Sequence, residues 1–129
     1  MPAPRQAVAA DGAPAPAGPY SQGIRSGDLL FLAGQTPVDP ATGLLAEGDL
    51  GEQTRQCLRN LQAVAQAAGG DLRDAVRCAV YVTDLDGFAE INAAYAEFFT
   101  DPLPARTTIE VAALPLGAPV EIDAIVALG

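Results

Sequence analysis

Residues 104–123 read P-A-R-T-T-I-E-V-A-A-L-P-L-G-A-P-V-E-I-D and decide the fold class, because they predict two strands late in the chain. Apolar and polar side chains alternate over 106–111 and again over 120–126, which is the pattern of half-buried strands. A connection rich in Pro and Gly joins the two. Arg106 and Glu121 are therefore expected on neighbouring strands beside apolar surface, as a site for a small carboxylate substrate requires.

The expected register of these strands separates the two charged side chains. A simple hairpin centred near Leu116 would place Arg106 about opposite Ile125 and not opposite Glu121. We therefore expect Arg106 and Glu121 to meet through a ligand or across a boundary between subunits. Taken without the rest of the chain, both residues also fit a solvated strand face.

The composition limits the class of protein. A chain of 129 residues predicts one domain with a core of ordinary size. The formal charge of −9, with only seven basic residues, argues against nucleic acid and anionic membranes as partners. The chain has no apolar run long enough for a transmembrane helix and no apolar core of a signal peptide near its start, so we expect a soluble cytoplasmic protein.

The residue types that are missing restrict the chemistry. The chain has no histidine, which excludes Ser-His-Asp and Cys-His mechanisms and histidine zinc sites. It also has no glycine-rich nucleotide loop. Catalysis by this chain must therefore rely on carboxylates, arginine, tyrosine, hydroxyls and backbone groups. Cys57 and Cys78 lack metal-ligand spacing and are expected to be buried, free thiols.

Hydrophobic periodicity predicts the remaining elements. In chain order they are a possible edge strand at 5–9, strands at 21–25 and 29–33, a helix at 50–68, a strand at 76–83 and a helix at 85–99. Asp49 is the expected N-cap of the first helix, and Asp84 or Asp86 that of the second. The buried stripe of the second helix is expected to consist of Phe88, Ile91, Tyr95 and Phe98.

These elements predict an α+β fold, a two-layer sandwich with a mixed sheet of about six strands and two helices on one face. Residues 1–12 are expected to be a tail or a short edge strand before a single domain at 13–129. The strand at 29–33 is almost wholly apolar, so it should be central and covered on both faces. An apolar sheet face that one chain cannot cover indicates self-association.

Six motifs, in this order and spacing, make the chain resemble the Rid family, also called YjgF, of reactive-intermediate deaminases. They are A-P-A-P-A-G-P-Y-S-Q (13–22), L-A-G-Q-T-P-V-D-P-A-T-G (32–43), E-Q-T-R-Q-C-L-R-N-L (52–61), V-Y-V-T-D-L-D-G-F-A-E-I-N-A-A-Y-A-E-F-F (80–99), P-A-R-T-T-I-E-V (104–111) and V-E-I-D-A-I (120–125). The resemblance covers nearly the whole chain, from about Ala13 to Leu128.

The resemblance implies a fold, an assembly and an activity. The fold is a chorismate-mutase-like α+β sandwich, and the assembly is a homotrimer with sites in the clefts between subunits. The better-known branch of the family hydrolyses small 2-imino acids, such as 2-iminopropanoate and 2-iminobutanoate, to 2-keto acids and ammonia. No metal or other cofactor is implied.

The resemblance also assigns roles to residues of this chain. Arg106 matches the arginine that binds the substrate carboxylate, and Glu121 matches the glutamate that holds the attacking water. Tyr20 matches a tyrosine that lines the site, and Asn92 an asparagine close to it. Gly34, with Gln35, matches the G-Q pair after the apolar strand.

Two positions depart from the family pattern at the substrate-binding site. Ala33 stands where serine is frequent, and Thr108 stands where cysteine is frequent. Because the arginine, the glutamate and the tyrosine are retained, the departures concern substrate preference more than the reaction. A Thr108 that contacts the substrate through its backbone carbonyl would make its side chain matter less.

Each assignment has a structural alternative. Tyr20 fits a turn residue that packs on the core, Asn92 fits a structural hydrogen bond, and Gly34 fits a constraint on the turn. A non-catalytic ligand-binding or chaperone-like trimer is the alternative for the whole protein. An endoribonuclease, also proposed in this family, is disfavoured by the negative charge.

Overall fold

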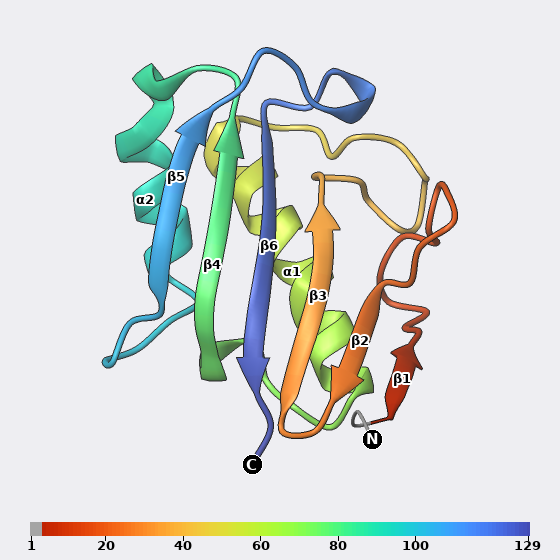
Figure 1. Cartoon of the computed structure of the whole chain (residues 1–129). Coiled ribbons are helices and arrows are strands. Elements are labelled where there is room, and N and C mark those ends of the chain that lie inside the picture. Colours follow the sequence, from red (N-terminus) through yellow and green to blue (C-terminus); the bar gives the residue numbers. More distant parts are fainter. Residues whose placement is uncertain (1–3) are drawn as a thin grey trace.

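The computed structural model describes residues 4–129, which form one six-stranded sheet with two α-helices behind it (Figure 1). The strands are β1 (Arg5–Val8), β2 (Gly23–Ser26), β3 (Leu29–Gln35), β4 (Ala75–Val82), β5 (Ala105–Glu110) and β6 (Val120–Ala127). The α-helices are α1 (Leu50–Ala67) and α2 (Phe88–Ala96), and short 3-10 turns span Leu72–Asp74, Leu85–Gly87 and Pro115–Gly117. The predicted two-layer α+β sandwich is therefore confirmed, as is the edge strand near the start of the chain.

The sheet has the strand order β1-β2-β3-β6-β4-β5. The pairs are antiparallel except for β4 and β5, which run parallel. The expectation that residues 104–123 form two neighbouring strands is wrong, because β4 lies between β5 and β6 (Figure 1). Alternation fixes which face of a strand is buried but not which strand it pairs with. Placing β4 inside the sheet gives both of its edges hydrogen-bonding partners.

The core lies between the sheet and α1. The Asp49 side chain caps α1 as predicted, accepting a hydrogen bond from the Glu52 N–H (2.9 Å). One face of the helix is fully buried and belongs to one core with the inward residues of β3, β4 and β6. The largest fully buried side chains of this layer include Leu30, Leu58, Leu61, Val64, Val80, Val82, Val120, Ile122 and Val126. Cys57 and Cys78 are free and buried, as expected.

The second helix is shorter than predicted. Asp84 caps a 3-10 turn, accepting from the Asp86 N–H (2.9 Å), and α2 follows from Phe88. Ile91 and Tyr95 are buried, but Phe88 is 42% exposed, so its place in the predicted buried stripe is wrong. Phe88 begins α2 at the edge of the molecule, where it contacts Arg106 instead of the core.

The sheet face opposite the helices is open in the single chain. Leu29, Phe31, Val76 and Ile109 are each between 39% and 47% exposed there. The strand at 29–33 is consequently covered on one face only, since both helices lie on the other side (Figure 1). No helix within residues 4–129 is long and apolar enough to cross a membrane.

Candidate active site

The first group of predicted site residues lines a cavity of about 580 Å³ beside the end of β3. Tyr20, Gly34, Gln35 and Glu121 all contribute to it. Ala33 lies next to this group, and its N–H donates to the Gln22 carbonyl (3.0 Å). The structure thus places Tyr20 of the first motif, the Gly34–Gln35 pair of the second motif and Glu121 of β6 beside one cavity.

Gly34 leaves the space that the Glu121 carboxylate occupies. A Cβ atom at position 34 would lie 2.5 Å from Glu121 Oε2. The register of β3 with β6 shifts between Leu32 and Gln35, and such bulges often re-aim groups next to active sites. Close approach of Glu121, and not a special backbone angle, therefore explains the glycine.

Glu121 is a carboxylate that is costly to ionise. It is half-buried on β6, and burial followed by the negative charge of Asp123 raises its pKa above the ordinary value. Asp123 itself accepts a hydrogen bond from the Tyr81 hydroxyl (3.0 Å). A carboxylate with a raised pKa beside a cavity is suited to take a proton from water.

Tyr20 lines the same cavity as Glu121. Its side chain is 53% exposed, so the alternative of a turn residue packed on the core is wrong. Its hydroxyl oxygen accepts from the Ala17 N–H (3.2 Å), which leaves the O–H proton free for a ligand.

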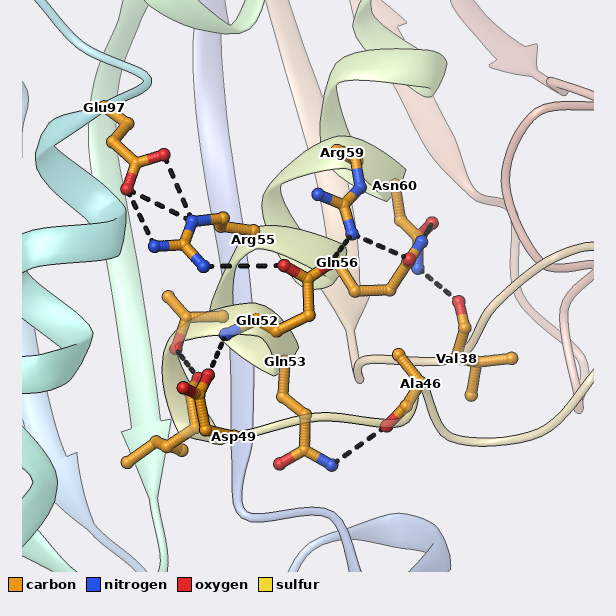
Figure 2. Close-up of polar contacts among 12 residues, drawn as sticks. Val38, Ala46, Asp49, Glu52, Gln53, Arg55, Gln56, Arg59, Asn60 and Glu97 are labelled. Atoms are coloured by element: carbon orange, nitrogen blue, oxygen red, sulfur yellow. Dashed lines mark hydrogen bonds and ion pairs between the residues drawn. The ribbon is translucent and has the colours of Figure 1, made fainter.

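Buried amide side chains, which sequence reasoning did not single out, hold the cavity walls. Gln22, 4% exposed, donates from Nε2 to the carbonyls of Ala13 (3.3 Å) and Pro14 (2.8 Å) and fixes the N-terminal wall. Asn60 of α1, 1% exposed, donates to the Val38 carbonyl (2.8 Å) and fixes the loop after β3 (Figure 2). No local sequence signal marks Gln22, which precedes β2, whereas Asn60 is a polar residue on the buried face of α1.

The second group of predicted residues lies on the opposite edge of the sheet. Arg106 Nη2 donates to Asn92 Oδ1 (2.7 Å), and the guanidinium carbon lies 4.7 Å from the centre of the Tyr95 ring and 5.5 Å from that of Phe88. Such cation–π contacts restrict a guanidinium while leaving its remaining N–H groups available. Asn92 thus accepts a hydrogen bond from Arg106, and its contact with the substrate stays a prediction.

A shallow hollow of about 520 Å³ adjoins this arginine, lined by Leu85, Phe88, Arg106 and Thr108. The Thr108 hydroxyl oxygen is buried and has no hydrogen-bond partner within residues 4–129. Arg106 is therefore pre-positioned at a hollow whose lining it shares with Thr108. This arrangement can accept a planar anion such as a carboxylate.

Arg106 and Glu121 lie on opposite faces of the sheet. Arg106 pairs with Cys78 of β4, whose side chain is buried under the helices. Glu121 pairs with Tyr81, three residues further along β4 and therefore on the open face. One chain cannot bring these two side chains to the same small ligand. A site that uses both needs Arg106 from one copy and Glu121 from another.

The described part of the chain contains no group of three or more Cys, Asp and Glu residues that could hold a metal ion. The charged groups at the two half-sites are the guanidinium of Arg106 and the carboxylates of Glu121 and Asp123. Together they can bind a carboxylate and remove a proton from water.

Comparison with known proteins agrees with the motifs and the fold. Residues 10–128 match the family model described as Endoribonuclease L-PSP. The chain is 53% identical over 121 residues to the RutC family protein y4sK of Sinorhizobium fredii, with 94% of this chain and 96% of that protein covered. It is 46% identical over 121 residues to a 2-iminobutanoate/2-iminopropanoate deaminase of Salmonella typhimurium, with 92% and 94% covered.

A solved structure gives the same result in three dimensions. TdcF of E. coli with bound serine superposes with a TM-score of 0.90 at 36% identity, covering 96% of this chain and 99% of that chain. Sequence and structure thus agree over almost the full length of the relatives. The chain therefore belongs to the Endoribonuclease L-PSP family, the Rid or YjgF family that its motifs resemble.

Proposed function

We propose that this protein is a deaminase that hydrolyses reactive 2-imino acids to 2-keto acids and ammonia without a metal. The observation that carries the proposal is the pair of half-sites: a pre-positioned guanidinium at Arg106 and a carboxylate of raised pKa, Glu121, facing a cavity. The Salmonella relative bears the name of this activity, and the E. coli structure holds an amino acid, whose carboxylate resembles that of a 2-imino acid.

The proposal includes an assembly in which a second copy completes each site. Arg106 and Glu121 face opposite sides of the sheet, and the open side carries exposed apolar residues such as Phe31 and Ile109. Burial of such a face between copies is favourable. A closed ring of three copies, as the family resemblance implies, would place Arg106 of one copy beside the cavity of the next.

The proposed reaction follows from these groups. Arg106 binds the substrate carboxylate through two N–H groups, which fixes C2 of the protonated imine. Glu121 accepts a proton from a water molecule whose oxygen adds to C2, and the C=N π electrons move to nitrogen. Glu121 then returns this proton to the amine nitrogen, the C–N bond breaks and ammonia leaves. The hydroxyl group gives its proton back to Glu121, so the former water oxygen becomes the keto oxygen. The Tyr20 hydroxyl is placed to donate a hydrogen bond during proton transfer.

The activity is testable with imines made in situ by an amino-acid oxidase in the presence of semicarbazide. We expect the purified protein to lower the amount of imine trapped and to raise the rate of keto-acid release. Undiminished trapping at high protein concentration would contradict a deaminase. Saturable binding of 2-keto acids without any such turnover would indicate the non-catalytic alternative.

Replacing Asp123 with asparagine is expected to move the acid limb of the pH profile to lower pH. The base works when Glu121 is ionised, so activity is present above its raised pKa and lost as the pH falls through it. Asparagine removes the charge that helps raise this pKa but keeps an oxygen for the Tyr81 hydroxyl. The measurement is kcat/KM against pH.

The matched control for this shift is Asp11→Asn, in an exposed stretch near the N-terminus. It should leave the acid limb in place. Burial contributes more to the raised pKa than Asp123 does, so the limb should move only part of the way toward the ordinary glutamate value. An acid limb that stays unmoved in Asp123→Asn would remove Glu121 as the titrating base.

A further inference from the structure

The cavity that holds Glu121 is mostly apolar away from that carboxylate. Six of its lining residues are Pro14, Ala15, Ala17, Pro40, Pro115 and Leu116. Among the described lining residues, Glu121 is the one that carries a charge. The amide of Gln22, which also belongs to the lining, is already engaged with the N-terminal segment. Nothing in this wall matches a charged substrate side chain.

Leu116 has no structural reason to be a leucine. Its side chain is 68% exposed, so it adds little to the core. Its backbone has φ 62° and ψ 14°, a left-handed conformation that strains any residue with a Cβ. Glycine fits such a position better, and the following residue, Gly117, adopts φ 70°. A strained, exposed leucine at the rim of a cavity is typical of a residue kept for binding.

We propose that Leu116 contacts the side chain of the substrate and that the protein prefers 2-imino acids with apolar side chains larger than methyl. This inference rests on the proposed function. With the substrate carboxylate on Arg106 of a second copy and C2 beside Glu121, the third substituent of C2 must enter the rest of the cavity. The volume of about 580 Å³ lies within the range of roughly 300–1,000 Å³ typical of ligand pockets, so a methyl group would fill little of it.

The test compares imines derived from leucine, alanine and glutamate by competition with semicarbazide, which gives relative kcat/KM. The wild type should favour the leucine-derived imine and disfavour the glutamate-derived one, whose second carboxylate would approach Glu121. Leu116→Ala should lower kcat/KM about tenfold for the leucine-derived imine while leaving the alanine-derived imine within about twofold. Leu116→Met should restore most of the loss.

Leu116→Gly separates binding from backbone strain. It should lose the same preference as Leu116→Ala but unfold at a higher temperature than that variant at equal protein concentration, since glycine relieves the positive φ. The matched control is Leu103→Ala, which removes a leucine that is 63% exposed and lies outside the cavity. It should leave the preference unchanged.

Two outcomes overturn the proposal, and a third concerns a different claim. An unchanged leucine-to-alanine ratio in Leu116→Ala would show that this side chain does not contact the substrate. A wild type that favours the alanine-derived or glutamate-derived imine would contradict the assigned substrate class. A wild type inactive on all three imines would instead contradict the deaminase activity itself.

Discussion

Replacing Arg106 with alanine is expected to reduce kcat/KM for 2-imino acids at least about hundredfold while leaving the fold intact. Two charge-assisted hydrogen bonds to a carboxylate contribute roughly 1.5–3 kcal/mol each, and each 1.4 kcal/mol corresponds to about a factor of ten. Arg106 has no ion-pair partner within residues 4–129, so its removal leaves no buried carboxylate unpaired. The measurement is kcat/KM with an oxidase-generated imine.

Two variants test whether the planar pair of N–H donors of Arg106 is needed to bind the substrate carboxylate. Arg106→Lys keeps the charge but loses the planar pair of donors, so it should recover only part of the activity. Arg73→Ala removes an arginine whose side chain is 68% exposed, far along the chain from the site, and should behave as wild type. Full activity in Arg106→Ala would remove this residue from the site.

Replacing Glu121 with glutamine is expected to reduce kcat by about 10²–10⁴-fold, the usual contribution of a positioned general base. Glutamine has nearly the same shape, so it fits beside Gly34 and keeps the cavity walls in place. Binding of a 2-keto acid should survive, because the carboxylate is held by Arg106. Steady-state kinetics and calorimetric titration with the product measure the two effects separately.

The stability of this variant provides an internal check. The pKa of Glu121 is raised in the folded protein, so its carboxyl favours folding while protonated and disfavours it once ionised. Glu121→Gln should therefore unfold at a higher temperature than wild type at neutral pH. The difference should vanish below the ordinary pKa of glutamate. A variant that is less stable than wild type at neutral pH would contradict a raised pKa of Glu121.

Much of the fold follows from the sequence because its signals are local. Asp49 and the apolar stripe behind it define α1 to within one residue, and alternation defines the buried face of β6 and of β4 from Cys78 onward. The strand pairing of residues 104–123 cannot be predicted from the sequence, because the backbone of β5 could form hydrogen bonds equally well with β6 or with β4. Which strand pairs with β5 depends on the whole sheet, because β4 needs a hydrogen-bonding partner along each of its two edges.

The sequence predicted the site residues that belong to a family motif and did not predict the others. The sequence places Glu121 and Gly34 on separate elements, and only the structure shows that the missing Cβ of one makes room for the other. Leu116 could not be found from the sequence, since its positive φ is a property of the folded turn. Phe88 was misplaced in the core because helical spacing does not reveal that α2 begins at Phe88, beside Arg106.

The central claim is that each site takes Arg106 from one copy and Glu121 from another, and mixing the two inactive variants tests it most directly. Arg106→Ala and Glu121→Gln are unfolded together in equal amounts, refolded and assayed. In a closed ring assembled at random, about one site in four receives both intact residues, so the mixture should recover about a quarter of wild-type activity. A mixture that forms mixed assemblies yet stays as inactive as its components would contradict the two-copy site.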